Sequence, residues 1–97
     1  MGRRATAEFS RKGNTHMIRV SNHAPNAVIC AGISAVMYAL VGTLMNNDVE
    51  WKTRTMTKGL VELVFTTDDP KALEDIRMAE IGLKQIELGN PGSIAFI

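Results

Sequence analysis

Polar and apolar residues alternate near the start of the chain with the period of a β-strand. Residues 5 to 22 hold two short, mixed stretches separated by the turn residues RKGN at 11 to 14, a pattern that predicts a β-hairpin. A second alternation, VEWKTRTMT, places four residues on one face: Val49, Trp51, Thr53 and Thr55. The turn residues KG then lead into LVELVFTT, so these stretches predict a second hairpin.

A long uncharged segment separates the two hairpins. Pro25 and Asn26 break the strand before it, and Asn26 or a neighbour is expected to cap a helix from about Ala27 to about Leu44. One apolar stripe recurs at helical spacing: Ile29, Ile33, Val36, Leu40 and Leu44. Because small residues line another side, this helix needs two partners. We expect a sheet on one face and a second helix or a second subunit on the other.

The stretch TDDP at 67 to 70 predicts the start of another helix, with Asp69 as the cap and Pro70 at the first helical position. Its apolar stripe has steps of three and four: Ala72, Ile76, Ala79, Leu83 and Ile86. GNPG at 89 to 92 ends the helix, and SIAFI adds a short last strand. The order β-β-α-β-β-α-(β) predicts one α+β domain over residues 1–97, a two-layer fold in which a mixed or antiparallel sheet packs against two helices.

The segment from 27 to 45 raises an alternative, because an uncharged helix of this length spans about 29 Å, close to a bilayer core. The amphipathic segments on both sides need a core to cover, so we favour a buried central helix and expect no membrane partner. No basic and apolar signal segment precedes the first strand, which favours a cytoplasmic protein.

Charge and cysteine content exclude several kinds of site. A net charge of +1 argues against direct nucleic-acid binding. The basic residues near the N-terminus are typical of a solvated strand edge: Arg3, Arg4, Arg11, Lys12 and Arg19. A single cysteine permits no intramolecular disulfide and no structural zinc cluster, so we expect no metal and no cofactor.

The only cysteine, Cys30, follows His23 by seven residues. A helix N-terminus and a neighbouring imidazole both favour the thiolate, the attacking form of a cysteine. Cys30 falls in the first turn of the expected helix, whose free N–H groups can face a developing oxyanion. The intervening APNAVI is long enough for the chain to turn back, although spacing alone favours a core cysteine over a catalytic pair. His16 has no nucleophile near it in sequence and is expected at the surface.

The segment NHAPNAVICAGISAV resembles the signature of the ribosomal-processing cysteine proteases, the Prp family, in which GHA ends the second strand and VCAxxSA opens the long helix. The order of elements along the whole chain is also similar. The resemblance implies a bacterial, cytosolic, homodimeric endopeptidase that removes a short N-terminal extension from the large-subunit ribosomal protein L-twenty-seven. It places the catalytic cysteine on Cys30, the histidine on His23 and a nearby serine on Ser34.

The chain departs from this family pattern around the site. The family glycine before the histidine is Asn22, and the acidic residue three before the cysteine is Ala27. The loop from His23 to Cys30, which contains Asn26, is short and carries a proline, which indicates a more open groove.

The substrate and the activity both have alternatives. Phage-like relatives make a capsid or scaffold protein an alternative substrate. A non-catalytic dimeric module that binds a ribosomal or capsid protein is the alternative function. Nothing in the sequence singles out a third, orienting residue.

Overall fold

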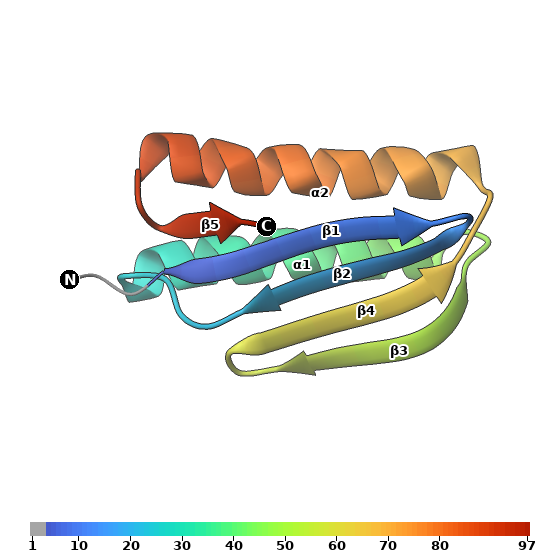
Figure 1. Ribbon diagram of the computed structural model, residues 1–97, viewed down its shortest axis with the longest axis horizontal. Helices are drawn as coiled ribbons and strands as arrows, with labels where there is room; N and C mark the ends of the chain where they lie inside the picture. The colour runs from blue at the N-terminus through green and yellow to red at the C-terminus, as the bar shows by residue number, and fades with distance from the viewer. Residues whose placement is uncertain (1–3) are drawn as a thin grey trace.

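The computed structural model describes residues 4–97 as five strands and two helices in two layers (Figure 1). The elements, in chain order, are β1 (Ala5–Lys12), β2 (Thr15–Ser21), α1 (Ala27–Met45), β3 (Glu50–Thr57), β4 (Leu60–Thr66), α2 (Pro70–Gly89) and β5 (Ile94–Phe96). This order confirms the predicted α+β fold. Of the basic residues near the N-terminus, Arg3 lies outside the described residues.

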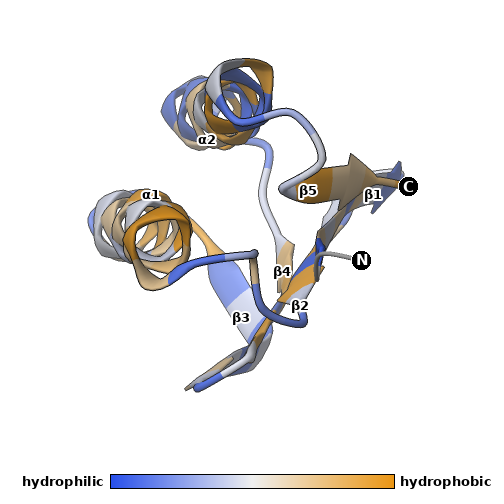
Figure 2. Ribbon diagram, turned by 90° about the vertical axis from the view of Figure 1, so that its left-hand side faces the viewer, coloured by the Kyte–Doolittle hydropathy of each residue, from blue (hydrophilic) through white to orange (hydrophobic). Residues whose placement is uncertain are grey.

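The strands form one sheet in the order β3-β4-β2-β1-β5. β2 pairs antiparallel with both β1 and β4, whereas β5 pairs parallel with β1. Both helices cover the same face of this sheet, and its other face is uncovered (Figure 2). Of the two arrangements that the sequence left open, the sheet is therefore the mixed one.

The core lies between the sheet and the helices. β2 and β4 bury alternate residues on the helix-covered side, including Ile18, Leu63 and Phe65. Each such side chain stabilises the fold by about 1.5–3 kcal/mol relative to its exposed state. The residues that α1 buries are Ile29, Ile33, Met37, Leu40, Val41 and Leu44.

Val36 corrects the predicted stripe of α1, because it is only half-buried. Its methyl groups lie 3.6 Å from the position that a Cβ at Gly82 of α2 would take. Val36 thus faces the neighbouring helix, while Met37 and Val41 face the sheet. The second helix that α1 was expected to need is therefore α2.

The predicted alternation in β3 is wrong after Trp51. The pairing of β3 with β4 shifts register between Trp51 and Thr53, which is the signature of a β-bulge. Trp51 lies opposite the buried Phe65, but Thr53 lies opposite Val64 on the uncovered face. A bulge adds one residue to the strand, so every later side chain changes face, and Arg54 and Met56 now share the helix-covered side with Trp51.

His16 is also corrected, since only 5% of its surface is exposed. Its ring stacks on Phe65 with 5.5 Å between ring centroids. Burial lowers the pKa of His16, with a smaller lowering from the Arg11 guanidinium. The ring packs on Phe65 at the end of β2 away from His23.

Helix α1 is long and apolar enough to cross a membrane by length and composition. In this fold one side of it packs on the sheet and another side packs against α2. Its remaining surface is apolar and exposed, most clearly at Val28, Tyr38 and Met45.

The carboxylate of Glu87 holds the C-terminal strand to the end of α2. It accepts the N–H of Gly92 at 2.9 Å and the N–H of Ile94 at 2.7 Å. Together with the Ser93 hydroxyl, these donors lower the pKa of Glu87. Donors to a carboxylate favour its charged form, so the link depends on pH.

We predict that acid weakens this link. Because the pKa of Glu87 is lower in the folded chain than in the unfolded one, its contribution is complete above the unfolded value of about 4.3 and is lost as pH falls through the folded value. Urea unfolding between pH 5 and pH 2.5 should therefore show a shallower pH dependence in Glu87→Gln than in the wild type. The exposed Glu74→Gln is the control, and an unchanged slope in Glu87→Gln would contradict the assignment.

Candidate functional site

His23 is placed by an abrupt change of direction at the end of β2. Asn22, the first residue beyond the strand, has φ 69°, in the left-handed region. Its N–H donates to the carbonyl oxygen of Gly59 in the β3–β4 turn at 3.1 Å. This bond continues the β2–β4 pairing by one residue beyond Ser21 and Leu60, so the chain leaves the sheet at a defined point.

The left-handed conformation suits the residue found at this position. Glycine adopts positive φ without steric cost, and asparagine tolerates it better than most other residues. Asn22 can thus hold the turn that sends His23 out of the sheet.

The imidazole of His23 lies against Gly59. A Cβ on Gly59 would come within 3.1 Å of His23 Nε2, closer than real Cβ contacts usually are. Gly59 itself has φ 82°, which a side chain would also disfavour. The turn therefore needs glycine for two reasons, and the absent side chain makes room for the ring.

Cys30 is positioned by the start of α1. Asn26 is the N-cap, and its side-chain oxygen accepts the N–H of Ile29 at 2.9 Å, as predicted. The half-buried Cys30 thiol lies 3.7 Å from the carbonyl oxygen of Ala24, to which it donates. Ala24 is buried, so the loop that follows His23 folds inward beneath the sulfur.

The start of α1 also decides which N–H groups are free. The N–H of Cys30 donates to the carbonyl of Asn26, and that of Ile29 donates to the Asn26 side chain. Within residues 4–97, the uncommitted amides of the first turn are those of Ala27 and Val28. Neither of these two residues lines the cavities that contain His23 and Cys30.

Two adjoining cavities bring the candidate residues together. The inner cavity, about 70 Å³, is lined partly by core residues such as Val20 and Met37, and the outer cavity, about 380 Å³, partly by exposed residues such as Tyr38. His23, Cys30 and Ser34 line both cavities. Asn22 lines the inner cavity, whereas Asn26 lines neither and acts as the helix cap. The imidazole and the thiol thus face the same space.

The β3–β4 turn is the part of the site that the sequence did not reveal. Thr57 and Gly59 line both cavities, and Lys58 lines the outer one. The turn was interpreted only as a hairpin connection. The signal that could have placed it is the sheet order, because pairing β4 with β2 brings the start of β4 beside the end of β2, where His23 follows.

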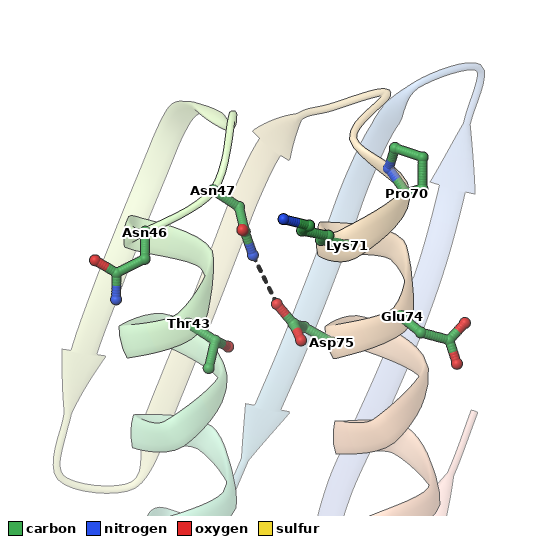
Figure 3. A pocket seen from close by; sticks show the side chains of 7 residues that line it. All are labelled: Thr43, Asn46, Asn47, Pro70, Lys71, Glu74 and Asp75. Carbon is green, nitrogen blue, oxygen red and sulfur yellow. Dashed lines mark hydrogen bonds between the residues drawn. The ribbon is translucent and has the colours of Figure 1, made fainter.

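The largest cavity, about 590 Å³, lies elsewhere, between the end of α1 and the start of α2 (Figure 3). Its lining residues are Thr43, Asn46, Asn47, Pro70, Lys71, Glu74 and Asp75. Asn47 donates to Asp75 across it at 2.7 Å, which ties the two helix ends together. This cavity is lined by no cysteine or histidine, so the smaller pair of cavities is the better candidate site.

No family model matches the chain, and no curated protein matches it by sequence. Solved structures do match. The essential ribosomal processing protease Prp from S. aureus, in complex with a covalently linked product peptide, has a TM-score of 0.81 at 16% identity, covering 95% of this chain and 96% of that one. The same protease with a substrate peptide has a TM-score of 0.72 at 15% identity, covering 98% and 97%.

A third similar structure is SMU.848 from Streptococcus mutans, with a TM-score of 0.72 at 17% identity, covering 96% of this chain and 91% of that one. These likenesses extend over nearly the whole of each chain. They show that this protein has the fold of the Prp protease, and they confirm the resemblance seen in the sequence at the level of the fold.

We predict that Gly59→Ala displaces the His23 imidazole. The new Cβ meets Nε2, and the positive φ adds about 1–2 kcal/mol of strain. Gly13→Ala is a matched control, since Gly13 has φ 63° but open space around the Cβ position. Both variants should lose similar stability in urea, and only Gly59→Ala should shift the His23 ring resonances in an NMR spectrum. Unshifted His23 resonances would contradict the placement.

Proposed function

We propose that this protein is a cytoplasmic cysteine endopeptidase of the ribosomal-processing type, with Cys30 as the nucleophile and His23 as its base. The observation that carries the proposal is that the two side chains line the same pair of cavities, on the fold of a known processing protease. The Prp structures hold product and substrate peptides, so a protein segment is the substrate class that we infer here. No metal or other cofactor is required.

The chemistry follows from the two groups. His23 takes the proton of Cys30, and the thiolate attacks the carbonyl carbon of the peptide bond. His23 then gives the proton to the leaving amine, which leaves an acyl-enzyme on the sulfur. A water molecule, deprotonated by His23, cleaves that thioester and restores the thiol.

The substrate that we propose is the N-terminal extension of a large-subunit ribosomal protein of the L-twenty-seven type, with a related phage capsid or scaffold protein as the second candidate. Such an extension is flexible and reaches an open site without unfolding. The exposed side chains of Tyr38 and Lys58 line the outer cavity, so a segment of a larger protein can reach it from solvent.

We predict that the wild-type protein cuts a peptide spanning the start of this ribosomal protein at a single position. Cys30→Ala should lower the rate by about 10³-fold or more, because the nucleophile is lost. Ser10→Ala, at an exposed position outside both cavities, is the control and should retain the rate. The rate is measured by mass spectrometry of the products, and cleavage that survives Cys30→Ala would sink the mechanism.

Alkylation by iodoacetamide separates this proposal from a non-catalytic binding module. An activated Cys30 should react faster than free cysteine at pH 7, and His23→Gln should remove the difference. Equal rates in both proteins, together with binding of the peptide without cleavage, would favour the binding module.

We also propose that the protein is a homodimer that covers the groove between the two helices. A cavity of about 240 Å³ lies there, lined mainly by apolar residues that include Val36, Ala39 and Met78. The exposed fraction of Met78 is 69%, and Ile81 beside it is 48% exposed. Large apolar side chains that lie exposed next to one another are typical of an interface between subunits.

The dimer proposal predicts a mass twice that of the chain in sedimentation equilibrium. Met78→Glu should shift the mass to that of the monomer, because it buries a charge in the interface. Thr53→Glu adds the same charge on the uncovered face of the sheet and should leave the dimer intact. A wild-type protein that stays monomeric at 100 µM would refute the proposal.

A further inference from the structure

A cavity of about 270 Å³ lies between the β1–β2 hairpin and α2, away from His23 and Cys30. Because β5 pairs with β1 only along Ala5–Ala7, the later part of β1 has no neighbouring strand on that side (Figure 1). Phe9 and Arg11 belong to this later part, and both line the cavity. The cavity thus occupies the space beyond the end of β5.

His16 is a buried polar residue in the wall of this cavity. Its exposed fraction is only 5%, and it reaches the cavity from β2. Within residues 4–97, His16 Nε2 is buried and has no hydrogen-bond partner. Buried polar atoms are almost always paired with protein, water or a ligand. The Phe65 ring that stacks on His16 offers no polar atom, so the cavity is the side from which a partner can reach the imidazole.

Two arginines border the cavity, Arg11 from β1 and Arg77 from α2. Arg11 lies opposite His16 in the β1–β2 pairing, so both side chains are on the helix-covered side of the sheet. In the part of the chain that the structure describes, neither arginine forms an ion pair. The acidic lining residue, Glu80, pairs with Lys84 at 3.6 Å. The cavity therefore favours an anion over a cation.

The Arg11 guanidinium is held at the turn of its hairpin. Its Nε donates to the carbonyl oxygen of Gly13 at 2.6 Å, and its terminal N–H groups donate to no other group among the described residues. Asp68 is the nearby carboxylate whose charge raises the pKa of His16, but it does not line the cavity. It accepts the side-chain amide of Asn14 at 3.1 Å instead. The terminal N–H groups of Arg11 thus remain available to an anion.

The rest of the cavity wall is largely apolar. Phe9 and Ile18 line it from the sheet, and Leu73 and Ile76 line it from α2. Ligand pockets in proteins combine mostly apolar walls with a few polar groups that orient the ligand. The volume is below the range of about 300–1,000 Å³ that drug-sized molecules need, so the ligand that fits here is small.

We propose that this cavity binds a small organic carboxylate with an apolar body. The carboxylate accepts charge-assisted hydrogen bonds from Arg11 and Arg77, and His16 Nε2 donates to it. The apolar body packs on Phe9 and Ile76. The site does not depend on the proposed protease function, because His16 and His23 lie at opposite ends of β2.

Titration of the ¹⁵N-labelled protein with 3-phenylpropanoate at pH 7 tests the proposal. This probe has a phenyl body and one carboxylate, and 3-phenylpropanamide is its uncharged analogue. The backbone amide signals of Phe9, His16 and Arg77 should shift, and the carboxylate should bind about tenfold more tightly than the amide. Equal affinities of the two probes would overturn the proposal, as would the absence of shifts at about 50 mM.

Arg77→Gln removes one charge from an exposed position of α2. It should weaken binding of the carboxylate about tenfold and leave binding of the amide unchanged. Arg19→Gln is the matched control, because Arg19 is exposed between the buried Ile18 and Val20, on the uncovered face of the sheet. If the two variants bind the carboxylate equally well, the proposal is wrong.

His16→Phe separates a ligand from a trapped water molecule. Phenylalanine keeps a ring stacked on Phe65 but has no nitrogen, so binding of the carboxylate should weaken about fivefold. An unchanged affinity would mean that water satisfies His16, which overturns the proposal. If this buried substitution unfolds the chain, the comparison of Arg77→Gln with Arg19→Gln decides.

Discussion

The hydrogen bond between the Asn22 N–H and the Gly59 carbonyl oxygen is the constraint on which the site depends. It ends the β2–β4 pairing at the point where Asn22 adopts positive φ, so the chain leaves the sheet in one direction only. It also holds the β3–β4 turn beneath His23, where the missing Cβ of Gly59 makes room for the imidazole. The same bond therefore fixes the position of His23 and of the β3–β4 turn that lines the outer cavity.

Most of the fold could be predicted from the sequence, because each element has a periodic pattern with clear ends. Asn26 and Asp69 cap the two helices as expected, since a side-chain oxygen before an apolar run satisfies a free amide. The failures lie where a local irregularity reverses a pattern. The bulge after Trp51 has no signature in the alternation, and burial of His16 depends on stacking with a residue 49 positions away, Phe65.

The candidate site could be predicted only in part. The spacing of His23 and Cys30 was visible because one strand end, one short loop and one helix start connect them along the chain. The residues of the β3–β4 turn come from another part of the chain, and they reach the site only through the strand order. The sequence indicated that the start of α1 would have free backbone amides, but not which residues would carry them. Which of them stay free depends on the cap geometry of Asn26.

The composition of α1 follows from the number of surfaces that it meets. One side packs on the sheet through residues such as Met37, and a second side meets α2 at Val36. The remaining apolar surface divides between the groove shared by the two helices and the flank that carries Cys30 and Tyr38. A helix with apolar residues on all of these surfaces has no side left for charged residues. Its hydropathy therefore reaches that of a membrane span, although in this fold the helix packs on the sheet and on α2.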